Sequence, residues 1–320
     1  MNFKPIIIIG GEPQSIFLEI FVKVIKRKFR YPIILISSKK ILKKNIEKFK
    51  KNFKYNKLNK DFSNIKKDKI NLVDVNYDKF KFTRKKITSV SNSYIENSFK
   101  KAFEIIKNQG CCGLINGPVS KKSFLKGKYN GITEYLAKKT NSKDPVMLIY
   151  NKQLSVSPLT THIPISKVPR NIKKKDIIIK VKKIDKFYKE YIGKKPRFGI
   201  TGLNPHCESF DKENKEKTEI IPAIRVLRKN KIKISGPFAA DTIFLKENMK
   251  KYDVIIGMYH DQVLTPMKTL FGFNAINITL GLPFLRISPD HGPNVQMLGE
   301  NKSDPKSLIE SMFFFEKYEI

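Results

Sequence analysis

Short apolar runs alternate with amphipathic segments from the start of the chain. Residues 5–9 predict a buried strand, and residues 17–28 predict a helix. The apolar residues of that helix recur at helical spacing and share one face: Phe17, Ile20, Phe21, Val24 and Ile25. A second strand is expected at residues 31–37.

The alternation continues through the rest of the chain. A helix is expected at residues 91–108, and residues 170–186 are Lys-rich and predict a surface helix or a linker. Further strands are expected at residues 112–115, 147–150, 197–201, 254–258 and 274–279. This order is typical of an α/β protein with mostly parallel sheets and helices on both faces. Ligands of such sheets bind outside the carboxyl ends of the strands.

Composition narrows the class of protein. The chain has 320 residues, enough for a sizeable core in one large α/β unit or two lobes. No run approaches the roughly 18 consecutive apolar residues that span a membrane, and no signal peptide is visible. The three cysteines form neither a disulfide framework nor a C-x-x-C pair. We therefore expect a cytoplasmic protein with no membrane partner.

A net charge of +35 raises the question of nucleic-acid binding. The excess is concentrated in residues 21–70, with 18 Lys and Arg against 3 acids, whereas residues 201–300 carry 13 against 11. The basic stretch lacks the arginine clusters, zinc-ligand spacings and aromatic motifs of nucleic-acid modules. It predicts solvated helical faces and no specific nucleic-acid partner.

Three of the four histidines lie in compact motifs of scarce residues: Thr-His-Ile-Pro at His162, Asn-Pro-His at His206 and Tyr-His-Asp-Gln at His260. Imidazole is the commonest metal ligand in proteins, and three ligands leave positions open for a substrate. The wide spacing leaves an ordinary hydrogen-bonded role open for each of them. His206 and His260 follow expected strands, so the sequence suggests a divalent-metal site at the sheet edge.

Other groups suit an anionic substrate. No G-x-G-x-x-G or G-x-x-x-x-G-K-[ST] motif is present, so a standard Rossmann or P-loop site is not expected. Lys268, Arg286, Thr133 and Asn277 could bind a phosphate or carboxylate. Ordinary surface charge explains Lys268 well but explains Arg286 less well, because Arg286 follows an apolar run.

The motifs together resemble the 4-hydroxythreonine-4-phosphate dehydrogenase family of pyridoxal-phosphate biosynthesis. The resemblance rests on the order and spacing of several blocks between about residues 110 and 300: Gly117-Pro118-Val119, Thr133-Glu134-Tyr135-Leu136-Ala137, Thr161-His162-Ile163-Pro164, Gly202-Leu203-Asn204-Pro205-His206, Ala240-Asp241-Thr242, Tyr259-His260-Asp261-Gln262 and Asn277 through Arg286. Gly11-Glu12-Pro13 is similar to the N-terminal loop of the family.

The resemblance implies an NAD-dependent enzyme. Its reaction would oxidise 4-phosphohydroxy-L-threonine at C3 and release carbon dioxide, leaving 3-amino-2-oxopropyl phosphate. His162, His206 and His260 would bind one divalent metal, zinc, cobalt or magnesium, at the interface of a homodimer. A Lewis acid lowers the pKa of a bound hydroxyl and stabilises the enolate that decarboxylation leaves.

The resemblance also implies roles for other residues and a fold. Thr133, Lys268, Asn277 and Arg286 would bind the substrate, with Lys268 also catalytic. Asp241 and Asp261 would orient a histidine or relay a proton. His291 and Gly292, within residues 288–293, would bind NAD.

The implied fold is two-lobed α/β/α and similar to isocitrate and isopropylmalate dehydrogenases. Residues 1–125 and 262–320 are expected in the first lobe, on the cofactor side, and residues 126–261 in the second, with the metal ligands and the dimer interface.

The chain departs from the family pattern at three places. Ile132 stands where the family has a phosphate-binding histidine, the loop after Pro13 lacks two glycines, and residues 293–296 lack an aspartate. Two alternatives therefore stay open. One is a dehydrogenase of a related phosphorylated hydroxy acid, and the other is a non-catalytic homologue that keeps the fold and the metal.

Overall fold

The computed structural model describes residues 4–25, 27–58, 62–129, 131–208, 214–272, 274–289 and 291–318. The chain forms two compact units. Unit 1 contains residues 1–135 and 283–320, and unit 2 contains residues 136–282. The sequence placed residues 126–135 in the second lobe and residues 262–282 in the first, so the boundaries in the structure differ from the expected ones.

The sheet of unit 1 is parallel throughout. Its strand order is β3 (Tyr55–Lys57), β4 (Ile70–Asp74), β2 (Ile33–Ser37), β1 (Ile6–Ile9), β5 (Gly113–Asn116) and β12 (Arg286–Pro289). The four isoleucines of β1 are completely buried, because this strand lies between β2 and β5 and is covered on both faces. An unbroken apolar run is the pattern that such a strand requires.

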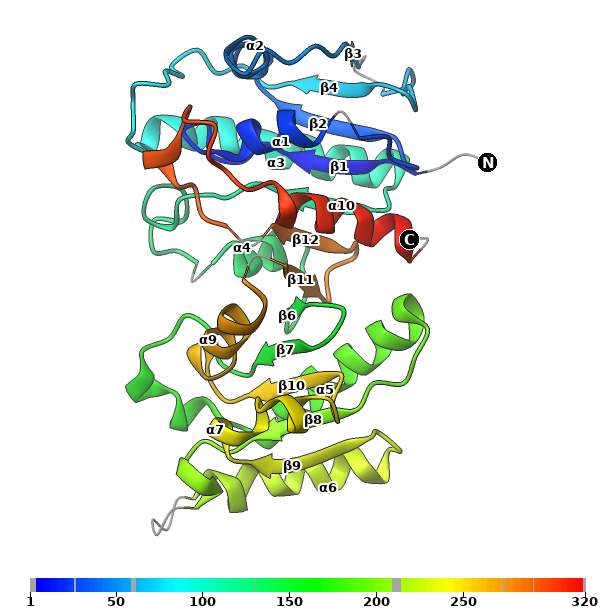
Figure 1. The fold of residues 1–320 in the computed structure, drawn as a ribbon, viewed down its shortest axis with the longest axis vertical. Coiled ribbons are helices and arrows are strands. Elements are labelled where there is room, and N and C mark those ends of the chain that lie inside the picture. The colour runs from blue at the N-terminus through cyan, green and yellow to red at the C-terminus, as the bar shows by residue number, and fades with distance from the viewer. Residues whose placement is uncertain are drawn as a thin grey trace. The chain divides into compact units, whose positions relative to one another are not determined.

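Helices cover both faces of this sheet (Figure 1). Helix α3 (Asn92–Gln109) packs on β1 and β2. Helix α10 (Lys306–Lys317) packs on β12 and on α1 (Phe17–Val24), which also contacts α2 (Lys39–Lys48). The buried residues of α3 follow helical spacing: Ile95, Phe99, Ala102 and Ile105.

The sheet of unit 2 is mixed. Its order is β11 (Ile276–Leu280), β6 (Val146–Tyr150), β7 (Ser155–Pro158), β10 (Val254–Gly257), β8 (Phe198–Thr201) and β9 (Ile234–Phe238). Strand β6 runs antiparallel to β11 and β7, whereas β10 is parallel to β7 and β8, and β8 is parallel to β9. The carboxyl ends of β7, β10, β8 and β9 therefore lie at one edge.

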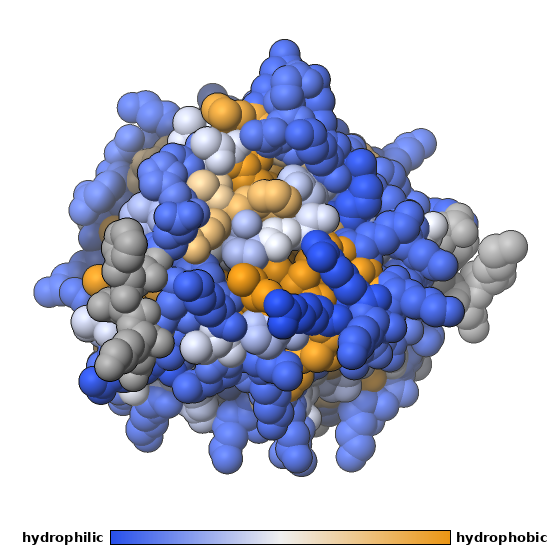
Figure 2. Space-filling model, turned by 90° about the horizontal axis from the view of Figure 1, so that it is seen from below, coloured by the Kyte–Doolittle hydropathy of each residue, from blue (hydrophilic) through white to orange (hydrophobic). Residues whose placement is uncertain are grey.

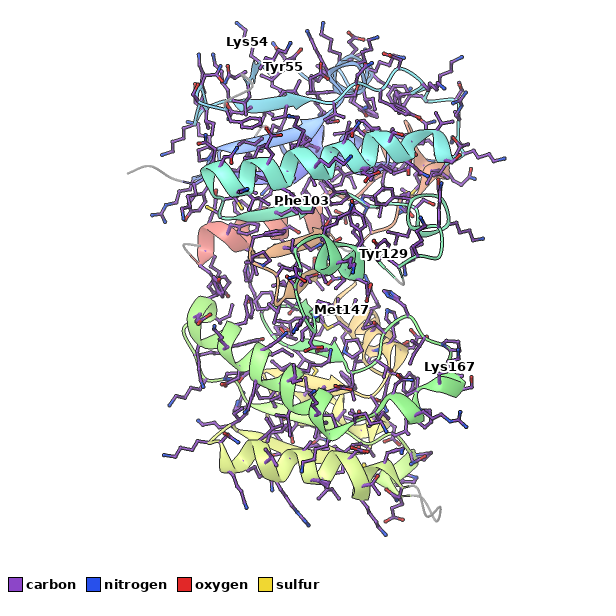
Figure 3. All side chains as sticks on the ribbon, turned by 180° about the vertical axis from the view of Figure 1, so that it is seen from behind. Lys54, Tyr55, Phe103, Tyr129, Met147 and Lys167 are labelled. Atoms are coloured by element: carbon purple, nitrogen blue, oxygen red, sulfur yellow. The ribbon has the colours of Figure 1, made fainter. Side chains whose placement is uncertain are left out.

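Two groups of helices flank this second sheet. Helix α5 (Lys174–Phe187) packs on β6 and on α6 (Ile221–Lys229). The two helices lie on the side of the sheet that faces the viewer in Figure 3. Helix α9 (His260–Phe271) packs on β7 and β10. The short helices α7 (Ala240–Ile243) and α8 (Lys246–Met249) contribute Ile243 and Met249 to the packing around α9. Val263 and Met267 of α9 join Val156 and Ile255 of the sheet in a buried cluster.

The structure confirms the α/β class with mostly parallel strands. It also corrects details. Helix α1 ends at Val24 and is shorter than the expected 17–28. Of the two expectations for the Lys-rich stretch, the surface helix is confirmed, and Ile177, Val181 and Ile184 form its buried face. Strand β12 was not expected. Within the described part of the chain, none of the helices is long and apolar enough to cross a membrane.

Candidate functional site

The predicted metal ligands follow the carboxyl ends of the parallel strands of unit 2. His162 comes four residues after β7, His260 three residues after β10 and His206 five residues after β8. Asp241 lies in α7, three residues after β9. Because these strands are parallel neighbours, their carboxyl ends share an edge, where ligands of α/β sheets bind.

The structure brings His162 and His260 together. The backbone N–H and hydroxyl of Thr160 both donate to the carbonyl of Met258, at 3.2 and 2.8 Å, which joins the segments after β7 and β10. The two imidazole rings lie 5.8 Å apart between centroids. Nδ1 of His260 is 2.6 Å from Oδ1 of Asp261, so this carboxylate can orient the ring.

The backbone is left-handed at two of the predicted ligands. His162 has φ 29° and His206 has φ 54°. Residues with a β-carbon adopt this conformation at a cost of order 1–3 kcal/mol, and such residues cluster at functional sites. Both side chains are exposed, so burial does not explain why these residues are held there.

Two residues that the sequence did not single out hold the His206 loop. Glu216 is buried, and its carboxylate accepts hydrogen bonds from the backbone of Leu203 at 2.7 Å and from the backbone of Asn204 at 2.8 Å. Gln262 accepts from the hydroxyl of Thr201 at 2.8 Å and donates to the carbonyl of Gly202 at 2.8 Å. Gln262 could have been identified from the sequence because it belongs to the His260 motif. No sequence motif pointed to Glu216.

Replacing Glu216 with alanine is expected to loosen this loop. Two backbone N–H groups and the Nδ2 of Asn204 would lose their acceptor, at a cost of roughly 2–4 kcal/mol of folding free energy. Urea unfolding measures this loss. The variant Glu247→Ala is the control, because Glu247 is exposed and pairs only with Lys250 on the surface. Equal stability of the two variants would contradict the role given to Glu216.

One chain does not assemble the full predicted metal site. Among the described residues, no group of three or more His, Cys, Asp or Glu side chains is placed to hold a metal ion. His162 and His260 supply two imidazoles with the chemistry that such an ion requires. His162 and His260 therefore provide part of a metal site, and a further ligand would complete it.

The predicted substrate groups of unit 2 lie on α9 and β11. Lys268 is half-buried in the last turn of α9, eight residues after His260, so the two side chains share a helix face. Asn277 lies in β11, opposite Ile149 of β6. The Oδ1 of Asn277 is buried and has no hydrogen-bond partner among the described residues, which leaves it available to a ligand.

Arg286 is the largest fully buried side chain described in the chain. It begins β12, and its Nε donates to Oδ1 of Asn116 at 2.7 Å. Burial lowers the pKa of the guanidinium to about 10, and the carboxylate of Glu134 opposes this shift, so Arg286 stays charged at neutral pH. A buried cation is costly unless an anion accompanies it.

Helix α4 (Ile132–Lys139) carries the remaining predicted substrate group. Thr133 is half-buried in its first turn, next to Glu134. Oε2 of Glu134 is buried and has no hydrogen-bond partner among the described residues. Ile132 is also half-buried at this helix start, where the positive end of the helix dipole favours an anion.

The predicted cofactor loop follows β12. His291 stacks on Phe17 with ring centroids 6.1 Å apart, and the carbonyl of Pro293 accepts from the backbone of Ile16 at 3.1 Å. Nδ1 of His291 lies 3.0 Å from the carbonyl of the exposed Gly292. Asp290 of this loop lies outside the described residues.

A buried acid lies in the loop after β1. Glu12 is 1% exposed, and neither of its carboxylate oxygens has a hydrogen-bond partner among the described residues. Burial raises its pKa to about 7, and Ser91 opposes this shift only in part. Gly11 allows the loop to pass Pro118, because a β-carbon there would lie 2.6 Å from the Pro118 carbonyl oxygen. The Gly-Gly-Glu-Pro motif directly after a strand was the available signal.

Comparisons with known proteins identify the family of the chain. Residues 28–314 match the model of a family described as pyridoxal phosphate biosynthetic protein PdxA. A 4-hydroxythreonine-4-phosphate dehydrogenase from Sulfurihydrogenibium is 38% identical over 316 residues, 94% of each chain. A relative from Oceanobacillus iheyensis, provisionally named D-threonate 4-phosphate dehydrogenase, is 29% identical over 98% of this chain and 97% of its own.

A solved structure shares the fold. The crystal structure of 4-hydroxythreonine-4-phosphate dehydrogenase from Klebsiella pneumoniae has a TM-score of 0.80 and 24% identity, covering 98% of this chain and 99% of its own. The family match and the identity across nearly the whole chain show that this chain belongs to the PdxA family of pyridoxal phosphate biosynthetic proteins.

Proposed function

We propose that this protein is an NAD-dependent and metal-dependent dehydrogenase of 4-phosphohydroxy-L-threonine. It oxidises the C3 hydroxyl, and the resulting 3-oxo acid loses carbon dioxide to give 3-amino-2-oxopropyl phosphate. The observation that carries the proposal is the pairing of His162 with His260 at the carboxyl edge of the parallel strands, in a chain of the PdxA family.

His162, His206 and His260 would hold the metal. A bound divalent ion would supply Lewis-acid chemistry, acidifying the substrate hydroxyl and stabilising the enolate. Imidazole suits zinc and cobalt better than magnesium. Asp261 would orient His260 through its 2.6 Å contact, and Asp241 or Asp261 would accept the hydroxyl proton.

We propose a homodimer whose interface includes the metal site. Three exposed apolar residues of unit 2 lie close in sequence to proposed site residues: Ile165 (65% exposed) follows His162, Leu245 (57%) follows Asp241, and Leu270 (44%) follows Lys268. Such residues are costly to leave in water. Apolar surface also lies among hydrophilic side chains at the end of the molecule seen in Figure 2. A second subunit would cover these residues and provide the missing metal ligand.

The anionic substrate would be bound by positioned polar groups. Arg286 would pair with a carboxylate or phosphate, because a guanidinium can donate two parallel hydrogen bonds to either anion. Lys268 would add a point charge and act on the reacting hydroxyl, whereas Asn277 and Thr133 would bind by hydrogen bonds. His291 and Gly292 would contact NAD in place of a glycine-rich Rossmann turn.

A second substrate deserves a direct comparison. The D-threonate 4-phosphate named for the Oceanobacillus relative is also a phosphorylated hydroxy acid, and Ile132 removes a histidine that the family uses for phosphate. Both acids carry a phosphate, so the loss of this ligand would affect both, and only a direct comparison of their turnover distinguishes them. We place the enzyme in the cytoplasm, where its three free cysteines stay reduced.

The test is NADH formation by the purified protein with added zinc, cobalt or magnesium, supplied with either phosphorylated acid. We expect metal-dependent absorbance at 340 nm, and a higher kcat/KM for 4-phosphohydroxy-L-threonine. A higher value for D-threonate 4-phosphate would establish the second substrate. No NADH with either acid and any metal would show a non-catalytic homologue.

A further inference from the structure

Unit 1 contains a cavity that the proposed reaction does not use. Its volume is about 510 Å³, within the range of roughly 300–1,000 Å³ that is usual for small-molecule sites. Three connections line it: residues 25, 27–29 and 31 before β2, residues 53–54 before β3 and residues 67–69 before β4. Lys54, one of the residues that line the cavity, is labelled in Figure 3.

The cavity lies at the opposite sheet edge from the proposed cofactor loop. Its sheet residues, Ile33 and Ile70, are the first residues of two parallel strands, so the cavity opens at their amino ends. Glu12 and His291 instead follow the carboxyl ends of β1 and β12. Because all strands of unit 1 are parallel, these ends belong to different edges.

The floor of the cavity is apolar and aromatic. Tyr31, Ile33 and Ile70 are buried, and the rings of Phe29 and Phe53 are half-buried beside them. Flat rings of this kind stack on the face of a heterocycle, a contact worth about 1–3 kcal/mol per base in nucleic-acid complexes. The floor therefore suits a planar ring.

The rim of the cavity is strongly basic. It has five cations, Arg27, Lys28, Lys54, Lys67 and Lys69, and one acid, Asp68, so its net charge is +4. Solvated lysines ordinarily spread over convex surfaces, whereas these converge on one hollow from three connections. Cations placed around a hollow attract anions, and phosphate is the anion that Arg and Lys bind best.

We propose that this cavity binds a mononucleotide, with the base stacked on the aromatic floor and the phosphate held by the basic rim. An uncharged heterocycle would leave the basic rim without an anion. Inorganic phosphate would leave the apolar floor exposed to water. A mononucleotide satisfies both parts of the cavity.

The binding test uses Phe53→Trp in the full chain. The chain contains no tryptophan, so the emission of this variant reports on the cavity alone. The titration is made without NAD, because NAD carries an AMP moiety that would compete for the cavity. We expect AMP to quench the emission and to bind at least ten times more tightly than adenosine or inorganic phosphate. Absence of quenching, or equal binding of AMP and adenosine, would overturn the proposal.

Charge reversal at the rim provides a second, independent measurement. Equilibrium dialysis of labelled AMP compares Lys54→Glu/Lys69→Glu with Lys100→Glu/Lys107→Glu, which makes the same charge change on the exposed face of α3. We expect at least tenfold weaker binding for the rim variant and near-unchanged binding for the α3 variant. Equal weakening of both would show non-specific attraction to a basic protein and would refute the site.

Discussion

Replacing His260 with alanine is expected to lower kcat/KM for 4-phosphohydroxy-L-threonine by roughly 10³-fold. A metal ion contributes several kcal/mol of transition-state stabilisation, and each 1.36 kcal/mol is tenfold in rate. His260 lies beside His162 at the strand edge, so its removal would take one of the two paired imidazoles. Initial rates of NADH formation measure the loss.

Metal content separates this prediction from a general loss of structure. After dialysis against a dilute chelator, we expect the purified His260→Ala protein to contain much less zinc or cobalt than the unmutated protein. The matched variant is Asp261→Asn, which removes only the carboxylate 2.6 Å from Nδ1 and is expected to lower activity or metal affinity about 10–100-fold. Full metal content and full activity in His260→Ala would refute the ligand role.

Replacing Glu12 with glutamine is expected to stabilise the protein at pH 8 by about 3 kcal/mol. The folded-state pKa of Glu12 is raised from 4.5 to about 7, so the folded protein binds the proton more tightly than the unfolded chain. Its carboxylate therefore costs stability progressively as the pH rises from about 4.5 to about 7, and the full cost remains above pH 7. Glutamine has the same shape and no charge to bury.

Urea unfolding at two pH values measures this effect. We expect the gain of Glu12→Gln to be roughly 2–3 kcal/mol larger at pH 8 than at pH 5. The control is Glu19→Gln, because Glu19 is equally buried but accepts hydrogen bonds from Lys23, Gly299 and Ser303. That variant is expected to be destabilised at pH 8. A gain that does not change with pH would contradict the raised pKa of Glu12.

Much of the fold could be predicted from the sequence because its elements are encoded locally. The isoleucine run of β1 and the four-residue spacing of Ile95 and Phe99 each report a buried strand or helix face without reference to the rest of the chain. Strand β12 was not predicted because it begins with Arg286, and arginine seldom lies in a protein core. Strand β6 was expected at residues 147–150, but its antiparallel direction was not, because periodicity does not report strand direction.

The candidate site was predicted unevenly for the same reason. His206 and His260 follow strands that the pattern marked, and the surrounding motifs are specific to a family. Glu216 gave no comparable signal, and the Gly-Gly-Glu-Pro motif marked Glu12 without indicating that its carboxylate is buried. Glu216 is buried beneath the Leu203 and Asn204 backbone, whereas Glu12 is buried without a hydrogen-bond partner for its carboxylate in the described part of the chain.

The sequence by itself determined the α/β class, the family and the residue types available for chemistry, because periodicity and motifs are properties of neighbouring positions. The tertiary structure decided which of those residues meet. His162 and His260 are 98 positions apart and come together because β7 and β10 are parallel neighbours. Burial of Glu12 and Arg286, which sets their pKa values, likewise depends on segments distant in sequence that pack around them.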